Sequence, residues 1–64
     1  MTVNVVYTDL KGTVLFVERN VRMEDGLAAK GDVVFLKELG GDYLIVERND
    51  DAEYGSVYLK VEKV

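Results

Sequence analysis

Gly12-Thr-Val-Leu-Phe-Val-Glu-Arg-Asn20 returns 29 residues later (41 minus 12) as Gly41-Asp-Tyr-Leu-Ile-Val-Glu-Arg-Asn49, and this repeat decides the fold. The tetrapeptide Val-Glu-Arg-Asn is identical in the two copies, and further matches extend the repeat to residues 12–26 and 41–55. A repeated segment of this length is one supersecondary unit, and two copies are too few for a solenoid. The repeat therefore predicts two related units, each the size of a β-hairpin, that bury their apolar faces against each other.

Runs of β-branched and aromatic residues, each as long as a strand, cover the repeat and its surroundings. They are Val3–Tyr7, Val14–Glu18, Val33–Lys37, Tyr43–Glu47 and Val57–Val61. Gly together with Asn or Asp separates them at 9–12, 39–42 and 49–55, which predicts three hairpins. The remaining connection is long, and we expect a short helical turn over residues 23–30 inside it. The sequence predicts an all-β fold, a small five-stranded barrel of the SH3-like or swapped-hairpin type.

The chain of 64 residues is expected to form a single domain, residues 1–64, near the size at which a hydrophobic core alone is barely sufficient. It contains no Cys and no His, so neither disulfides nor the common zinc sites are available. Additional stability must come from close packing or from self-association.

Three of the predicted strands are apolar on both faces, which a small barrel does not require. They are Val14–Val17, Val33–Leu36 and Tyr43–Val46. Twist, bulges and the long connection are one way to cover the second face, and a homodimer is the other. We favour the homodimer, because its interface would supply the missing core.

The formal net charge is −4, from 12 acidic and 8 basic residues. This balance disfavours nucleic acid as a partner, since binding to phosphates depends on clustered Lys and Arg. The basic residues of the first half still leave a basic face open as a possibility; they are Lys11, Arg19, Arg22 and Lys30. No run approaches the about 18 apolar residues of a membrane span, and the amino terminus lacks the pattern of a secretion signal. We expect a cytoplasmic protein without a membrane partner.

The repeated Glu18-Arg19-Asn20 and Glu47-Arg48-Asn49 are the first candidates for a binding site. Duplication is expected to place them at equivalent strand ends, where Arg19 and Arg48 would flank a shared groove and bind an anion or a partner's carboxylate. Charged strand ends followed by an Asn turn explain the same pattern without any site.

Tyrosines of the second half are the other candidates for contact with a partner, because Tyr is enriched in protein interfaces. Tyr54 and Tyr58 are expected to be exposed, whereas Tyr43 is expected in the core.

Catalytic and cofactor chemistry finds little support. Without His or Cys, no motif places a base beside Ser, Thr or a carboxylate. The acidic segment 49–53 lacks the spacing of a calcium loop, and Gly40-Gly41 is too short to cradle a phosphate. We predict no enzyme activity, no cofactor and no metal.

Residues 9–48 resemble the swapped-hairpin domain of AbrB-type transcription factors and antitoxins. The similarity lies in Asp9, Gly12, Val14, Phe16, Val21-Arg22, Gly26-Leu27, Gly31-Asp32 and the hairpin at Gly40-Gly41. Thr13 stands where that family has Arg, and a fifth strand follows. The resemblance implies a dimer that binds duplex DNA through Lys11, Arg19, Arg22 and Lys30.

Residues 24–64 are similar, in competition, to SH3-like barrels. The similarity lies in Glu24-Asp25, Lys30-Gly31-Asp32-Val33-Val34 and Gly41-Asp42-Tyr43, which stand where those barrels have the diverging turn, the second strand and the aromatic that opens the third strand. This resemblance implies a module that binds proteins.

The function expected from these observations is a non-catalytic β-barrel module that engages a protein partner, with Arg19, Arg48, Tyr54 and Tyr58 as contacts. A small acidic protein of this kind also fits an inhibitor encoded by a phage or plasmid. The alternative is an AbrB-like dimeric regulator that binds DNA.

Overall fold

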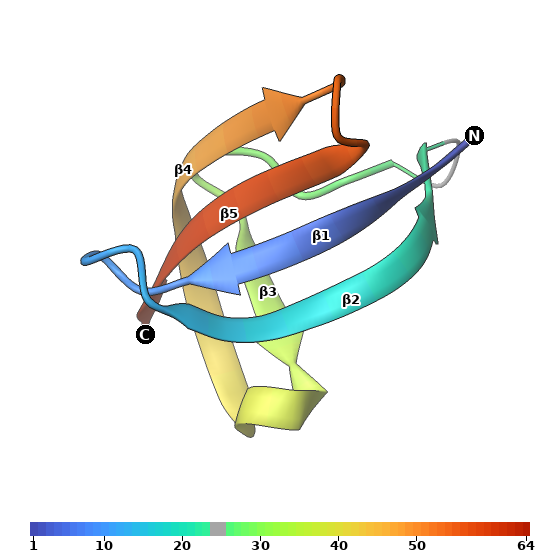
Figure 1. The fold of residues 1–64 in the computed structure, drawn as a ribbon. Coiled ribbons are helices and arrows are strands. Elements are labelled where there is room, and N and C mark those ends of the chain that lie inside the picture. The colour runs from blue at the N-terminus through green and yellow to red at the C-terminus, as the bar shows by residue number, and fades with distance from the viewer. Residues whose placement is uncertain (24–25) are drawn as a thin grey trace.

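The fold is one five-stranded sheet, curled into a half-barrel (Figure 1). The computed structural model describes residues 1–23 and 26–64. Its elements are β1 (Thr2–Thr8), β2 (Val14–Arg22), β3 (Val33–Leu36), the 3-10 turn η2 (Lys37–Leu39), β4 (Gly41–Asp51) and β5 (Ser56–Lys63). The strand order is β2-β1-β5-β4-β3, so β2 and β3 are the two edges. The predicted all-β fold with five strands is confirmed.

The three predicted hairpins are all present, and a parallel pairing of β1 with β5 joins them into one sheet. Turn chemistry explains the first hairpin. The Asp9 carboxylate accepts hydrogen bonds from the backbone N–H groups of Lys11 and Thr13, both at 2.9 Å. Gly12 follows with a φ of 89°, a left-handed conformation that glycine adopts without a steric penalty.

The core lies on the concave face of the sheet. Alternation along β5 places Val57, Leu59 and Val61 on this face with exposures of 2%, 1% and 2%. Ile45 of β4 is completely buried between them and the inward side chains of β1. The long connection contributes Leu27 and Ala28, which pack against this cluster and cover part of it.

Two strands extend further than expected, and each contains a bulge. The pairing of β1 with β2 jumps from Val3–Val21 to Val5–Glu18, and Asn20 in that bulge has a φ of 58°. The pairing of β4 with β5 jumps from Ile45–Val61 to Glu47–Lys60, which leaves Val46 as the extra residue. Both repeated Glu-Arg-Asn tripeptides therefore lie inside strands, not at strand ends as predicted.

The connection between β2 and β3 differs in part from the prediction. The expected helical turn over 23–30 falls partly on residues 24–25, which lie outside the described part of the chain. Met23 has a 3-10 conformation, and residues 26–29 have no helical structure. A 3-10 turn that the sequence did not predict forms instead at Lys37–Leu39 and ends at Gly40. No helix within residues 1–23 and 26–64 is long and apolar enough to cross a membrane.

Candidate functional site

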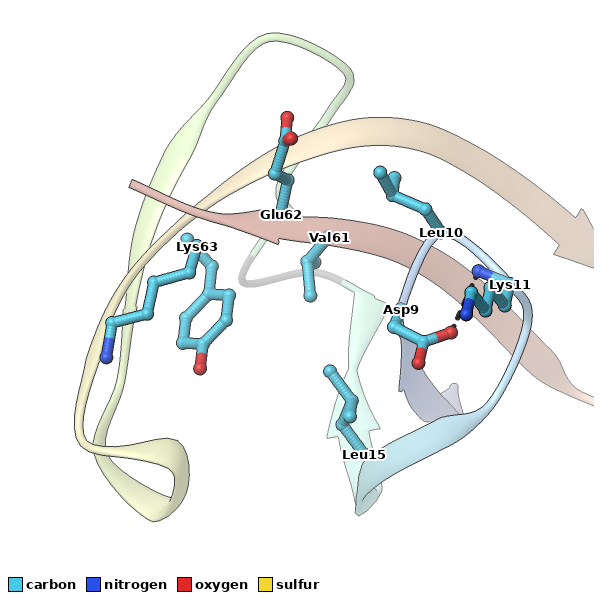
Figure 2. A pocket seen from close by; sticks show the side chains of 8 residues that line it. Asp9, Leu10, Lys11, Leu15, Val61, Glu62 and Lys63 are labelled. Atoms are coloured by element: carbon cyan, nitrogen blue, oxygen red, sulfur yellow. Dashed lines mark hydrogen bonds between the residues drawn. The ribbon is translucent and has the colours of Figure 1, made fainter.

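A groove opens at the end of the half-barrel where the β1–β2 turn approaches the carboxyl end of β5 (Figure 2). Its volume is about 410 Å³, within the range of pockets that hold ligands or anchoring side chains. Its lining comes from the turn and from three strands: Asp9, Leu10, Lys11, Leu15, Tyr43, Val61, Glu62 and Lys63.

The floor of the groove is apolar. Val61 belongs to the core and Tyr43 packs against it, so the floor continues the core outward. Leu10 and Leu15 remain 53% and 38% exposed, and the side chain of Leu15 points into the groove (Figure 2). Tyr7 pairs with Phe16 and Thr8 with Val14, which leaves Leu15 unpaired in a bulge. Bulges redirect side chains in this way.

Four charged residues of both signs surround this floor: Asp9, Lys11, Glu62 and Lys63. Asp9 is held in place by the two backbone hydrogen bonds of its turn. The stem of Lys63 lies over Gly41, where a Cβ atom would come within 3.5 Å of the lysine Cε. An apolar floor with a charged rim resembles the anatomy of a protein interface.

Arg48, a predicted contact residue, forms hydrogen bonds within its own chain. It lies opposite Leu59 and therefore on the concave face. Its guanidinium donates to Asp50 at 2.7 Å and 2.9 Å, and to the Ala28 carbonyl oxygen at 3.4 Å. The hydrogen bond with Asp50 raises the pKa of Arg48 and lowers that of Asp50. This arginine links β4 to the long connection.

Arg19 lies on the opposite face of the sheet. Its neighbour Glu18 pairs with the core residue Val5, so alternation directs Arg19 to the convex face, where it is exposed. Arg19 and Arg48 therefore do not flank one groove within a single chain, and neither lines the groove described above. Their role in partner binding stays a prediction.

The tyrosines are also separated. Tyr54, 73% exposed, lies in the β4–β5 turn, and Tyr58, 40% exposed, lies on the convex face beside Val6. Tyr43 packs against the core as predicted but also lines the groove. Sequence reasoning missed Leu10 and Leu15 as groove residues; an apolar Leu10 in an otherwise polar turn was the available indication.

The basic residues of the DNA-binding alternative are spread along the molecule. Lys11 lies in the turn before β2, Arg19 and Arg22 lie on β2, and Lys30 lies in the long connection. From Val14 to Arg22 the strand covers roughly 26 Å at about 3.3 Å per residue. Lys11 and Arg22 are thus at opposite ends of the hairpin.

The acidic residues at the end of β4 have structural partners. Asp50 binds Arg48, and an Asp51 carboxylate oxygen accepts a hydrogen bond of 3.4 Å from the backbone N–H of Tyr54. A second cavity beside this turn, lined in part by Asp50 and Asp51, measures only about 70 Å³. Within residues 1–23 and 26–64, no three His, Cys, Asp or Glu side chains are grouped so as to hold a metal ion.

In comparisons with known proteins, no family model, no curated protein and no solved structure matches this chain. The resemblances to AbrB-type domains and SH3-like barrels therefore stay predictions. What is established is the class of fold, an all-β half-barrel with an apolar groove at one end.

Proposed function

We propose that this protein is a non-catalytic binding module that engages a protein partner through the groove. The observation that carries the proposal is the apolar floor left open to solvent beside Leu10 and Leu15. Exposed Leu side chains that line a concavity and continue the core are typical of an anchoring pocket for a partner.

The groove also suggests the chemistry of the partner. Its volume accommodates one bulky apolar side chain, such as Leu, Met or Phe, with room for the adjoining backbone. Lys11 and Lys63 stand on the rim with Asp9 and Glu62, so charged residues of either sign beside the anchor can find an opposite charge. The occupant that fits is a peptide segment with an apolar anchor between charged residues.

Selection from a random peptide library displayed on phage tests the proposal. Selected peptides should share a bulky apolar residue flanked by charges, and their addition should shift the amide NMR signals of Leu10, Leu15 and Val61. Leu15→Asp should weaken their binding at least tenfold, whereas Val14→Asp, at the exposed neighbouring residue that does not line the groove, should not. Peptides that bind equally to Leu15→Asp, or that shift signals elsewhere, would contradict the proposal.

The DNA-binding alternative makes a different prediction for the same protein. A regulator would bind short duplex DNA with an affinity that falls steeply as salt rises, and Arg19→Ala together with Arg22→Ala would weaken it. Indifference to duplex DNA at low salt would leave the protein-binding module as the function.

A further inference from the structure

The open edge of β3 is the second unassigned surface of the molecule. Among the residues that the structure describes, β3 pairs with β4 on one side and with no strand on the other. We propose that the β3 edge of a second copy of this chain pairs with it in antiparallel orientation, about a two-fold axis at Val34, so that two half-barrels share one continuous sheet.

The backbone N–H and C=O groups along this edge are available for pairing with another strand. Ile45 N–H donates to the Asp32 carbonyl oxygen at 2.8 Å, so Ile45 of β4 directs its hydrogen-bonding groups toward β3. Alternation along β4 makes Tyr43 do the same, and Tyr43 lies opposite Val34. The backbone N–H and C=O groups of Val33 and Phe35 therefore point away from β4, in the plane of the sheet and beyond its edge.

The side chains at this edge are apolar and exposed. Val33 is 57% exposed and Phe35 is 66% exposed, although both are strand residues. Val33 lies opposite Leu44, and both are on the convex face, away from the buried Leu36. Exposed apolar edge strands of this kind are templates for pairing with another chain.

The proposed register follows from symmetry. Residues directly opposite each other in a sheet have their side chains on the same face. An antiparallel pairing about a two-fold axis must therefore join a residue on the convex face to another on the convex face, and a concave one to a concave one. With Val34 opposite Val34 of the partner copy, Val33 lies opposite the partner's Phe35, and this contact occurs twice. Both residues have outward backbone groups, so each pair gains two hydrogen bonds.

The register about Val34 also keeps both hydrogen-bonded pairs, each of Val33 with Phe35, inside the two β3 strands. Shifting the register by two residues toward η2 would leave Phe35 opposite the partner's Phe35 as the one such pair in the strands. It would place Val33 opposite the partner's Lys37, which belongs to the 3-10 turn. The register about Val34 therefore forms more backbone hydrogen bonds between the two strands.

The other edge is less suited to such pairing. The β2 strand contains the bulge at Asn20, with its left-handed backbone, and Glu18 and Arg19 beside it. Bulges and charged residues are the devices by which edge strands avoid association. On β3 the described strand carries neither, since Val33–Leu36 contains only apolar residues and pairs regularly with β4.

Sedimentation across a concentration series tests self-association. The interface is short, so we expect a dimer whose population rises with protein concentration. Phe35→Lys should keep the chain monomeric at concentrations where the natural sequence is mostly dimeric. Val14→Lys, at an exposed apolar residue of the other edge strand β2, should leave the dimer unchanged. A natural sequence that is monomeric throughout would overturn the proposal.

Single cysteines test the register, because the chain has none of its own. Opposed residues in a non-hydrogen-bonded antiparallel pair have Cα atoms about 4.5 Å apart, within disulfide reach. Val34→Cys should therefore form a disulfide dimer under mild oxidation. Val33→Cys should not, since the two copies would lie about 8 Å apart. Faster cross-linking at position 33 or 35 would overturn the register. The groove contains none of these residues, so peptide binding and dimer formation fail or succeed independently.

Discussion

Arg48 and Asp50, two residues apart on β4, are joined by two parallel hydrogen bonds, from Nε to Oδ1 at 2.7 Å and from Nη2 to Oδ2 at 2.9 Å. The pair lies on the core side of the sheet, and the same guanidinium reaches the Ala28 carbonyl oxygen. The arginine side chain is 25% exposed and the aspartate 49%. Solvent screening therefore limits what the ion pair contributes, and its main effect is to fix the long connection beside β4.

The ion pair of Asp50 should make the free energy of unfolding depend on pH in the acid range. An ordinary aspartate has a pKa of about 3.9. The hydrogen bond with Arg48 holds the pKa of Asp50 below that ordinary value. A carboxyl with a lowered folded-state pKa stabilises the fold above its unfolded pKa, and this contribution is lost as pH falls through the folded pKa. Asp50→Asn should cost less than about 1 kcal/mol at pH 7 and should differ less from the natural sequence at pH 3. Urea unfolding at both pH values, with exposed Asp42→Asn as the control, measures the difference.

If Asp42→Asn reduces the acid dependence as much as Asp50→Asn does, the Arg48 pair is not its source. The comparison is informative because both positions lie on β4, and the structure pairs Asp50 with an arginine through hydrogen bonds.

Tyr7 predicts the opposite dependence in alkali. Burial, then the charge of Glu18 and a hydrogen bond to it, and last the charge of Glu38, raise the pKa of Tyr7 above 10. A group with a raised folded-state pKa stabilises the fold below its unfolded pKa, and this stabilisation is lost as pH rises through the folded value. Tyr7 should thus ionise as a late step in an absorbance titration of the protein. Tyr7→Phe should remove that late step; a late step that persists in Tyr7→Phe belongs to another tyrosine.

Substitutions of Ile45 test how much loss of side-chain volume the small core tolerates. Its side chain is completely buried, so Ile45→Ala should destabilise the protein by about 2–5 kcal/mol and Ile45→Val by about 0.5–1.5 kcal/mol. A domain of this size is marginally stable, so the alanine variant should be largely unfolded at 37 °C. Val14→Ala, at a site 56% exposed, should change the free energy of unfolding by about 0.5 kcal/mol or less. Urea unfolding measures all three, and equal costs for Ile45→Ala and Val14→Ala would place the core elsewhere.

Local chemistry made the strands and hairpins predictable, because turn residues such as Asp9 and Gly12 act through their own backbone and nearest neighbours. The orientation of the repeated tetrapeptide was not predictable. Glu18 lies on the concave face opposite Val5, whereas Glu47 lies on the convex face opposite Lys60. The bulge falls after Glu18 in β2 but before Glu47 in β4, since each strand pairs with different neighbours. The position of each bulge depends on the neighbouring strands and not on the strand's own sequence alone. The repeated sequence therefore did not place Arg19 and Arg48 beside one groove, as had been expected.

The two copies of Asn in this repeat provide a matched pair for the last prediction. Asn20 has a φ of 58°, and its backbone N–H donates to the Asn4 side chain at 3.3 Å. Asn49 lies in regular strand, and its side chain donates to Glu47 at 2.8 Å on the surface. A β-branched residue is strained in the left-handed region, by about 1–3 kcal/mol. Asn20→Val should therefore lower the free energy of unfolding by that amount, and Asn20→Gly should leave it nearly unchanged.

Asn49→Val should be close to neutral, because valine suits an extended strand and the lost hydrogen bond is exposed. Urea unfolding of the three variants measures the contrast between two residues with identical preceding sequence. Equal destabilisation by Asn20→Val and Asn49→Val would mean that the bulge does not constrain Asn20. A cost confined to Asn20→Val would show that the different bulge positions of β2 and β4, and not the repeated sequence, determine what each copy requires.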